Sequence, residues 1–386
     1  MSEQKDQRGV MENRLKQKLA RGMTNVVEAT HRLKEEGKIS KDLLVDVGSS
    51  RKAQEPSMIF RPDPITNFLP GADISYVNEQ GILTKEGYII SNHAIRQTAE
   101  KLRIPATYLT SLIMGQEWQK TLAYEILNTH NSWVERDKVL VRAVGHEVRG
   151  VLSDQYRRLD SEMIFGTHID EVFKNGGALS DGYMDESRVM VESLLPQPIE
   201  IQSEMNGTIW LGFGTRIDTS DYGLKALELR SFVIQLICMN GLVRESVLRS
   251  VHLGAKLPDN LALSAETYRL DSMTTASAVR DLTKNLYSTE MIKTRMLEVK
   301  ASSEIKIDPA KELTQLFKSG KMLKGETEEI GKLLMRNDPE NGLYGESTLW
   351  KLTQGITAYA NAEGVDMTRR MDLQELAGDL FGRIKN

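Results

Sequence analysis

Arginines alternate with aromatic side chains through the middle of the sequence, and this pairing is the pattern with the clearest chemical use. The candidate nucleic-acid-binding residues are Arg142, Arg149, Tyr156, Arg157, Arg158, Arg216, Arg244 and Arg249, with Trp210, Phe213 and Tyr222 interleaved. Such pairings hold single-stranded nucleic acid, because guanidinium groups contact phosphates while any base can stack on an aromatic ring. The alternative interpretation is a sheet with solvated arginines and buried aromatic residues.

Other kinds of chemistry find little support in the residue types and spacings. The sequence has no GxxxxGK[ST] phosphate loop and no GxSxG nucleophile elbow, and Gly212 and Gly214 lack the third glycine of a dinucleotide fingerprint. No two of the six histidines have the i, i+4 spacing of a helical zinc site. A metal-dependent nuclease would need four aspartates to converge and hold magnesium for phosphodiester cleavage: Asp154, Asp160, Asp218 and Asp221. Aspartates in turns more often serve backbone hydrogen bonds. We therefore assign no catalytic residue and expect no cofactor or metal.

A β-hairpin must position the first of the arginines. Residues 138–153 alternate apolar and polar side chains around a turn at Gly145 and His146, which predicts two antiparallel strands. In this pattern Arg142 and Arg149 point outward from the hairpin. A helix that begins at Asp160 or Ser161 and ends at Gly176 and Gly177 should follow.

More strands are expected before the longest apolar run of the chain. A strand over residues 188–195 and a turn at Asn206 and Gly207 precede residues 231–243, which suit a segment buried on every side. The sequence therefore predicts an α+β fold, with a mixed, mainly antiparallel sheet and packed helices, followed by a helical C-terminal region.

The two ends of the chain are expected to be helical. Residues 10–36 favour a helix in a polar, solvated N-terminal arm, and the first 52 residues hold twelve Lys or Arg against eight Asp or Glu. In the rest of the chain, residues that favour helix N-termini are Ser91 or Asn92, Ser264, Ser288 and Asp308. We divide the chain into an arm (1–55), an α+β core (56–260) and a helical C-terminal region (261–386).

Composition limits the class of protein. The net charge of −4 gives no global excess of positive charge, so a nucleic-acid surface would have to be local. One cysteine, Cys238, excludes an internal disulfide framework. Neither an N-terminal signal nor a membrane-spanning apolar run is evident, so we expect a cytoplasmic protein with no membrane partner.

Three stretches together resemble the phage- and plasmid-borne family known as domain of unknown function 932. They are VRAVGHEVRGVLSDQYRRLD, then DTSDYGLKALELRSFVIQLICMNGLV with the later His252, Leu253 and Gly254, then STLWKLTQGITAYAN. The resemblance covers roughly residues 55 to 365. It implies an origin on a mobile element in a bacterial host more firmly than a mechanism, because the family has no settled biochemical activity and lends no catalytic residues.

Pattern and resemblance together favour single-stranded DNA binding or annealing in recombination or replication. A hairpin and helix on a curved sheet are similar, as a fold-level analogy, to the oligomeric annealing proteins of the Rad52-like and RecT-like groups. We expect a homo-oligomer that needs no nucleotide hydrolysis. The alternative is a non-catalytic protein-interaction factor that counters host defence and contacts a host or phage protein through its C-terminal helices.

Overall fold

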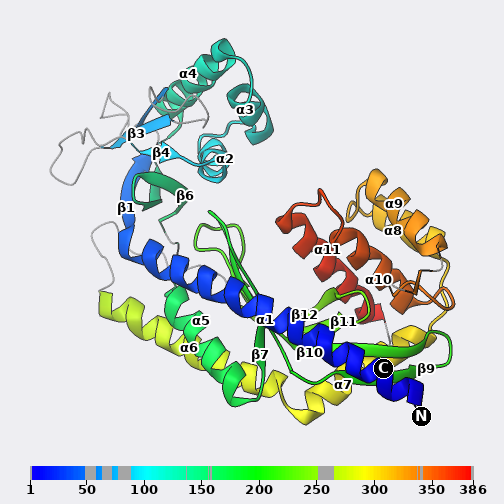
Figure 1. Cartoon of the computed structure of the whole chain (residues 1–386). Helices are drawn as coiled ribbons and strands as arrows, with labels where there is room; N and C mark the ends of the chain where they lie inside the picture. The colour runs from blue at the N-terminus through cyan, green and yellow to red at the C-terminus, as the bar shows by residue number, and fades with distance from the viewer. Residues whose placement is uncertain are drawn as a thin grey trace.

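The computed structural model describes residues 2–47, 58–62, 72–76, 88–135, 137–154, 156, 159–250, 265–336, 338–339 and 342–383 (Figure 1). With 55% helix, 25% strand and mixed sheets, the predicted α+β class and the helical C-terminal region are confirmed. The strands form two main sheets, the smaller with one apolar core and the larger with several.

The smaller sheet has the strand order β1-β5-β6-β4. Its strands are β1 (Ser40–Val47), β4 (Ile89–Ile90), β5 (Asp137–Val144) and β6 (Glu147–Ser153). Only the β4–β6 pair is parallel, and β5 and β6 form the predicted hairpin around Gly145 and His146. Three helices pack on this sheet over one apolar core: α2 (Asn92–Lys101), α3 (Ala106–Ile113) and α4 (Glu117–Trp133). A short pair, β2 (Met58–Pro62) and β3 (Ala72–Tyr76), lies beside α4.

The larger sheet is antiparallel and has the order β12-β11-β10-β8-β7, with β9 also paired to β10. Its strands are β7 (Ala178–Met184), β8 (Val189–Leu194), β9 (Ile199–Ser203), β10 (Gly207–Thr219), β11 (Leu227–Gln235) and β12 (Asn240–Ser250). The long strand β10 pairs along one edge with β9 in its first half and with β8 in its second half. β10 therefore holds the two halves of this sheet together.

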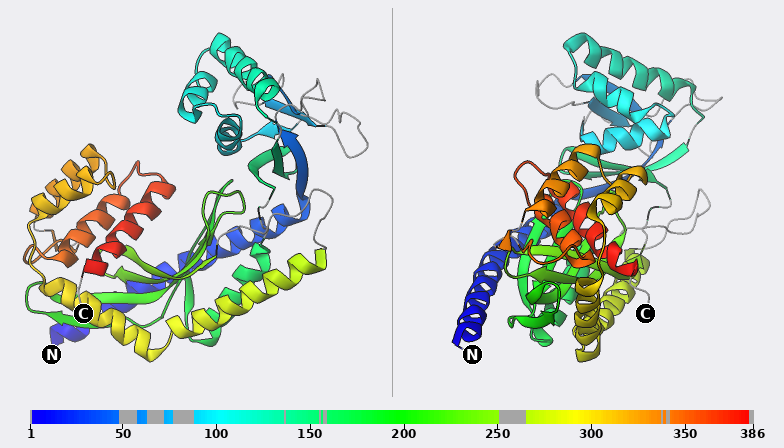
Figure 2. Two further views of the ribbon diagram at one scale, coloured as in Figure 1. Left: turned by 180° about the vertical axis from the view of Figure 1, so that it is seen from behind. Right: turned by 90° about the vertical axis from the view of Figure 1, so that its right-hand side faces the viewer.

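Besides the N-terminal helix, helices from two parts of the chain cover the larger sheet (Figure 2). They are α5 (Ser161–Lys174), α6 (Ala265–Leu286), α7 (Thr289–Glu304), α8 (Pro309–Lys318), α9 (Lys324–Met335), α10 (Leu349–Ala360), α11 (Met367–Asp379) and the 3₁₀ turn Leu380–Arg383. The helices α5 and α6 share one core with β7, β8 and the far half of β10, and α7 to α11 share another with β9, β10 and β11. The predicted cap residues Ser91, Asp160, Ser288 and Asp308 accept the expected backbone N–H groups, whereas Ser264 lies outside the described residues.

The helix α1 (Ser2–Ile39) runs along β7 instead of standing in solvent as an arm. Met11, Leu15 and Val26 are buried against the larger sheet. At Gly22 the contact is so close that a Cβ atom would lie 2.0 Å from the backbone of Ser180. The apolar stripe at helical spacing is therefore a packing face, and the expectation of a solvated arm is wrong for this helix.

The apolar run 231–243 is not one element. It spans the end of β11, a turn over residues 236–239 and the start of β12, and Met239 in that turn has a φ of 60°. Asn240 and Gly241 begin a new strand instead of ending the buried segment. Both strands of this hairpin are apolar because α1 covers one face of the sheet there and the C-terminal helices cover the other.

Candidate nucleic-acid interface and a cavity

Arg142 is buried at the junction of the two sheets. Its guanidinium donates to both carboxylate oxygens of Asp42 on β1, at 2.8 and 3.1 Å, and to the carbonyl oxygen of Asp221 at 2.7 Å. It also lies over the ring of Tyr156, 5.5 Å from the centroid, and the Tyr156 hydroxyl donates to the carbonyl of Ser220 at 3.0 Å. The prediction that Arg142 points outward is wrong, because the β10–β11 connection covers this face of the hairpin.

Arg149 is also buried, and it ties the hairpin to α1. It pairs with Glu36 of α1 at 2.6 Å and with Glu147 of its own strand at 2.9 Å. Its predicted outward orientation is therefore wrong as well, and both of its partners are carboxylates. A buried arginine that already holds two carboxylates has little capacity left for a phosphate.

Arg216 and Arg244 join the larger sheet to the C-terminal helices. The Nε of Arg216 donates to Glu192 of β8 at 2.8 Å, its Nη2 donates to Gln374 of α11, and its guanidinium lies 5.1 Å from the Phe232 ring centroid. Arg244 pairs with Glu298 of α7 at 3.1 Å and donates to the carbonyl of Gly378. Both arginines therefore make their contacts inside the protein and not on its surface.

The remaining predicted residues do not form a common surface with these four. Arg249 near the end of β12 is exposed, at 72% of its side chain, and lies 3.6 Å from Glu228. Arg157 and Arg158 fall outside the described residues, and Tyr156 is half-buried under Arg142. Among the predicted positions that the structure describes, Arg249 alone offers an exposed guanidinium.

The candidate aspartates do not converge on a metal site. Asp218 is buried between Arg188 and Lys225, Asp160 caps α5, and Asp221 accepts a hydrogen bond from Ser161. Burial alone would raise the pKa of Asp218, but Lys225 and Arg188 hold that pKa below its usual value. Within the described ranges, no group of three or more His, Cys, Asp or Glu side chains could hold a metal ion.

Basic residues that the arginine pattern did not include lie on α1. No acidic residue occurs between Glu12 and Glu28, whereas four basic residues do, and we call residues 14–21 the basic segment: Arg14, Lys16, Lys18 and Arg21. Arg14, Lys16 and Arg21 are exposed, and Lys18 lies 3.9 Å from Asp181 of β7. No carboxylate partner for Lys16 or Arg21 is found in the part of the chain that the structure describes. The signal was present in the sequence as the positive balance of the N-terminal region.

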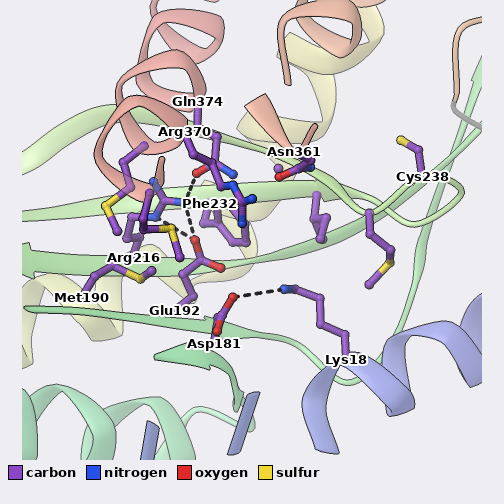
Figure 3. Close-up of a pocket in the computed structure, with 15 residues that line it drawn as sticks. Lys18, Asp181, Met190, Glu192, Arg216, Phe232, Cys238, Asn361, Arg370 and Gln374 are labelled. Atoms are coloured by element: carbon purple, nitrogen blue, oxygen red, sulfur yellow. Dashed lines mark hydrogen bonds and ion pairs between the residues drawn. The ribbon is translucent and has the colours of Figure 1, made fainter. Parts of the chain in front are cut away.

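A cavity of about 330 Å³ lies between α1, the larger sheet and α11 (Figure 3). Arg216, Glu192 and Phe232 line it from the sheet, and Arg370 and Gln374 line it from α11. Its remaining walls are Lys18, Asp181, Met190, Ile234, Cys238, Met239, Gly241, Asn361, Met367 and Met371. The volume is at the lower end of the range for small-molecule sites, which runs from about 300 to 1,000 Å³.

The comparisons with known proteins give no relative. No protein-family model, no curated protein and no solved structure matches the chain. A search of the described helices finds none long and apolar enough to cross a membrane. The functional argument therefore depends on the residues and their geometry.

Proposed function

We propose that this protein binds single-stranded nucleic acid, and that it does so through the basic segment of α1 during recombination or replication of a phage or plasmid. The observation that carries the proposal is the exposure of Arg14, Lys16 and Arg21 on a stretch of helix without acidic residues. Phosphate neutralisation supplies most of the affinity of non-specific nucleic-acid binding, so unpaired exposed cations are the groups it requires. The phage or plasmid setting comes from the sequence resemblance alone, since no family model matches the chain.

Three of the four cations of this segment have no carboxylate partner among the described residues, and Lys18 alone lies near a carboxylate, that of Asp181. Arg14 donates to the carbonyl of Ile237, a neutral acceptor, so its positive charge is not neutralised by this contact. By contrast, Arg142 and Arg149 are buried and paired with carboxylates, so they would not contribute to binding. We therefore move the proposed phosphate contacts from the hairpin to α1.

Exposed aromatic rings support a single strand as the ligand. Trp118 in the first turn of α4 is 62% exposed, and Trp133 in its last turn is 84% exposed. Stacking of a base on such a ring contributes about 1–3 kcal/mol and needs unpaired bases. Replacement of both tryptophans by alanine should weaken single-strand binding while the salt dependence stays unchanged, as measured by fluorescence anisotropy. A parallel loss of salt dependence would contradict the division into stacking and phosphate contacts.

In the annealing reaction that we propose, subunits lie side by side along one strand. Cationic side chains contact the phosphates, the bases stay available for pairing with a second strand, and no cofactor or nucleotide hydrolysis is needed. Such an arrangement requires a homo-oligomer, so the mass of the complex should grow with the length of the oligonucleotide.

The test replaces the three exposed cations together, as Arg14→Gln, Lys16→Gln and Arg21→Gln. For a single strand, each lost phosphate contact lowers the slope of log K against log salt by about 0.7, so the triple variant should lose about 2 in slope. Anisotropy of a labelled oligothymidine across a salt series measures this slope directly.

A matched control removes the same charge elsewhere. Lys318→Gln, Lys324→Gln and Lys332→Gln alter exposed residues of α8 and α9 and change the net charge equally. This variant should keep the slope of the unmodified protein. Equal losses in both variants would show that only net charge matters and would remove the assignment to α1.

A protein-interaction role is the second candidate, and one observation favours it. Large apolar side chains are exposed on the C-terminal helices, with Leu323 at 67% and Met335 at 88%. Exposed apolar side chains can mark protein contacts, although single ones are common on monomers. Tight binding of a host protein that is lost in Leu323→Ser, together with no salt-dependent nucleic-acid affinity, would favour this candidate.

A further inference from the structure

The cavity between α1 and α11 holds a buried cation whose hydrogen-bonding capacity is incomplete. Arg216 is 1% exposed, and its Nε and Nη2 donate to Glu192 and Gln374. Its Nη1 has no hydrogen-bond partner in the described structure. A buried N–H donor of a charged group is destabilising when it lacks an acceptor, so an oxygen acceptor supplied from the cavity would be bound favourably.

A second cation in the same cavity lacks a counter-charge. The Nε of Arg370 donates to the carbonyl of Ala360 at 3.1 Å, and no carboxylate among the described residues pairs with it. The other charges of the lining cancel, because Lys18 faces Asp181 and Arg216 faces Glu192 (Figure 3). The lining therefore carries one net positive charge, that of Arg370.

Flexible apolar side chains form part of the remaining wall, beside polar groups that supply most of its accessible surface. Four methionines line it together with Phe232 and Ile234: Met190, Met239, Met367 and Met371. Thioether side chains adapt to irregular shapes and make favourable contacts with aromatic rings. A free inorganic ion would leave this surface uncovered, whereas an organic body would cover it.

We propose that this cavity binds a small organic anion whose acidic group accepts hydrogen bonds from Arg216 Nη1 and Arg370, while its apolar body lies against Phe232 and the methionines. The shared chemistry is a carboxylate or phosphate monoester on an apolar or aromatic body. The proposal does not depend on nucleic-acid binding, since none of the exposed cations of α1, Arg14, Lys16 and Arg21, lines the cavity.

The test measures binding of four probes by isothermal titration calorimetry and thermal shift. Benzoate and phenyl phosphate carry an aromatic body, and acetate and inorganic phosphate carry the same acidic groups without one. We expect one saturable site for an aromatic probe and much weaker binding of its small counterpart. The probe that binds, benzoate or phenyl phosphate, identifies the acidic group.

Variants locate the site. Arg370→Gln should weaken binding of the aromatic probe about tenfold or more, because a charge-assisted hydrogen bond is lost. Arg370 is half-buried and without a carboxylate partner, so this variant should fold. Lys324→Gln removes one exposed charge from α9 and should leave the affinity unchanged. The triple variant of α1 should bind the probe normally while it loses oligonucleotide binding, which separates this proposal from the proposed function.

Any of three results would overturn the proposal. The first is the absence of saturable binding of all four probes at millimolar concentrations. The second is equal affinity for the aromatic probes and their small counterparts. The third is an affinity that Arg370→Gln leaves unchanged. Double substitution Arg216→Met with Glu192→Met removes the buried pair without leaving one charge alone, and binding retained in that folded variant would also contradict the proposed contacts.

Discussion

His168 makes the stability of the larger sheet depend on pH between about pH 7 and pH 5. The imidazole is fully buried between α5, β10 and α6, where Nδ1 lies 2.9 Å from the Thr283 hydroxyl and Nε2 lies 3.3 Å from the Thr215 hydroxyl. Burial lowers the pKa of His168 to about 3. The unfolded chain has an ordinary histidine pKa near 6.5, so between this pH and about pH 3 it binds a proton that the folded protein does not bind.

The sign and the size of the effect follow from linkage. Because the folded pKa is lowered, the stabilisation is complete above about pH 6.5 and is lost as the pH falls toward 3. Between pH 7 and pH 5 the histidine of the unfolded chain gains most of a proton, while the folded protein gains almost none. This difference lowers the free energy of unfolding by about 2 kcal/mol, since one pKa unit corresponds to about 1.4 kcal/mol.

Urea unfolding followed by circular dichroism at pH 7, 6 and 5 measures the effect. His168→Gln should be less stable at pH 7, since it loses buried contacts, but its loss of stability from pH 7 to pH 5 should be smaller by about 2 kcal/mol. The control His31→Gln changes an exposed residue of α1 and should keep the pH dependence of the unmodified protein. An identical pH dependence in His168→Gln and the unmodified protein would refute the reasoning.

Two further predictions concern the packing of the larger sheet. Burial raises the pKa of the Cys238 thiol to about 12, which lowers the thiolate fraction about 1,000-fold, so iodoacetamide should modify the folded protein far more slowly than the urea-unfolded chain. Mass spectrometry measures both rates, and similar rates would contradict a raised pKa of this half-buried thiol. Gly378→Ala would place a Cβ atom 1.7 Å from the carbonyl oxygen of Val243, and it should destabilise the protein by about 3 kcal/mol in urea unfolding. Gly331→Ala, in α9 with its nearest neighbour at 3.8 Å, should instead stabilise it by up to about 1 kcal/mol, and a similar loss in both variants would rule out the close contact as the cause.

Local signals predicted the local structure. The caps at Asp160, Ser288 and Asp308 were predictable because a side chain there bonds to a backbone N–H group two or three residues later. The hairpin around Gly145 and His146 was also predictable from local sequence, since the alternation of apolar and polar side chains and the turn lie within sixteen residues.

The outward direction of the hairpin arginines was not predictable from such signals. Arg142 pairs with Asp42, which is 100 residues earlier, and Arg149 pairs with Glu36, which is 113 residues earlier. The side chains that cover this face come from β1, α1 and the β10–β11 connection. A single sequence shows the period of a strand but not which distant element covers each face.

The apolar run and the cavity illustrate the same limit. Two apolar strands joined by a short turn look like one buried segment, because the turn at residues 236–239 contains Ile237, Cys238 and Met239 in place of typical turn residues. The cavity could not be found from spacing, since its lining comes from α1, five strands, the 236–239 turn, Asn361 after α10, and α11. The basic segment of α1 was visible in the sequence, but only the structure separates its exposed cations from the buried arginines.

Binding of a labelled oligonucleotide, single-stranded and double-stranded, across a salt series with parallel light scattering tests the central claim most directly. We predict a salt-sensitive preference for the single strand in a particle heavier than the 43.5 kDa chain, with the slope reduced by about 2 when Arg14, Lys16 and Arg21 are replaced by glutamine. The absence of binding at low salt would contradict the claim.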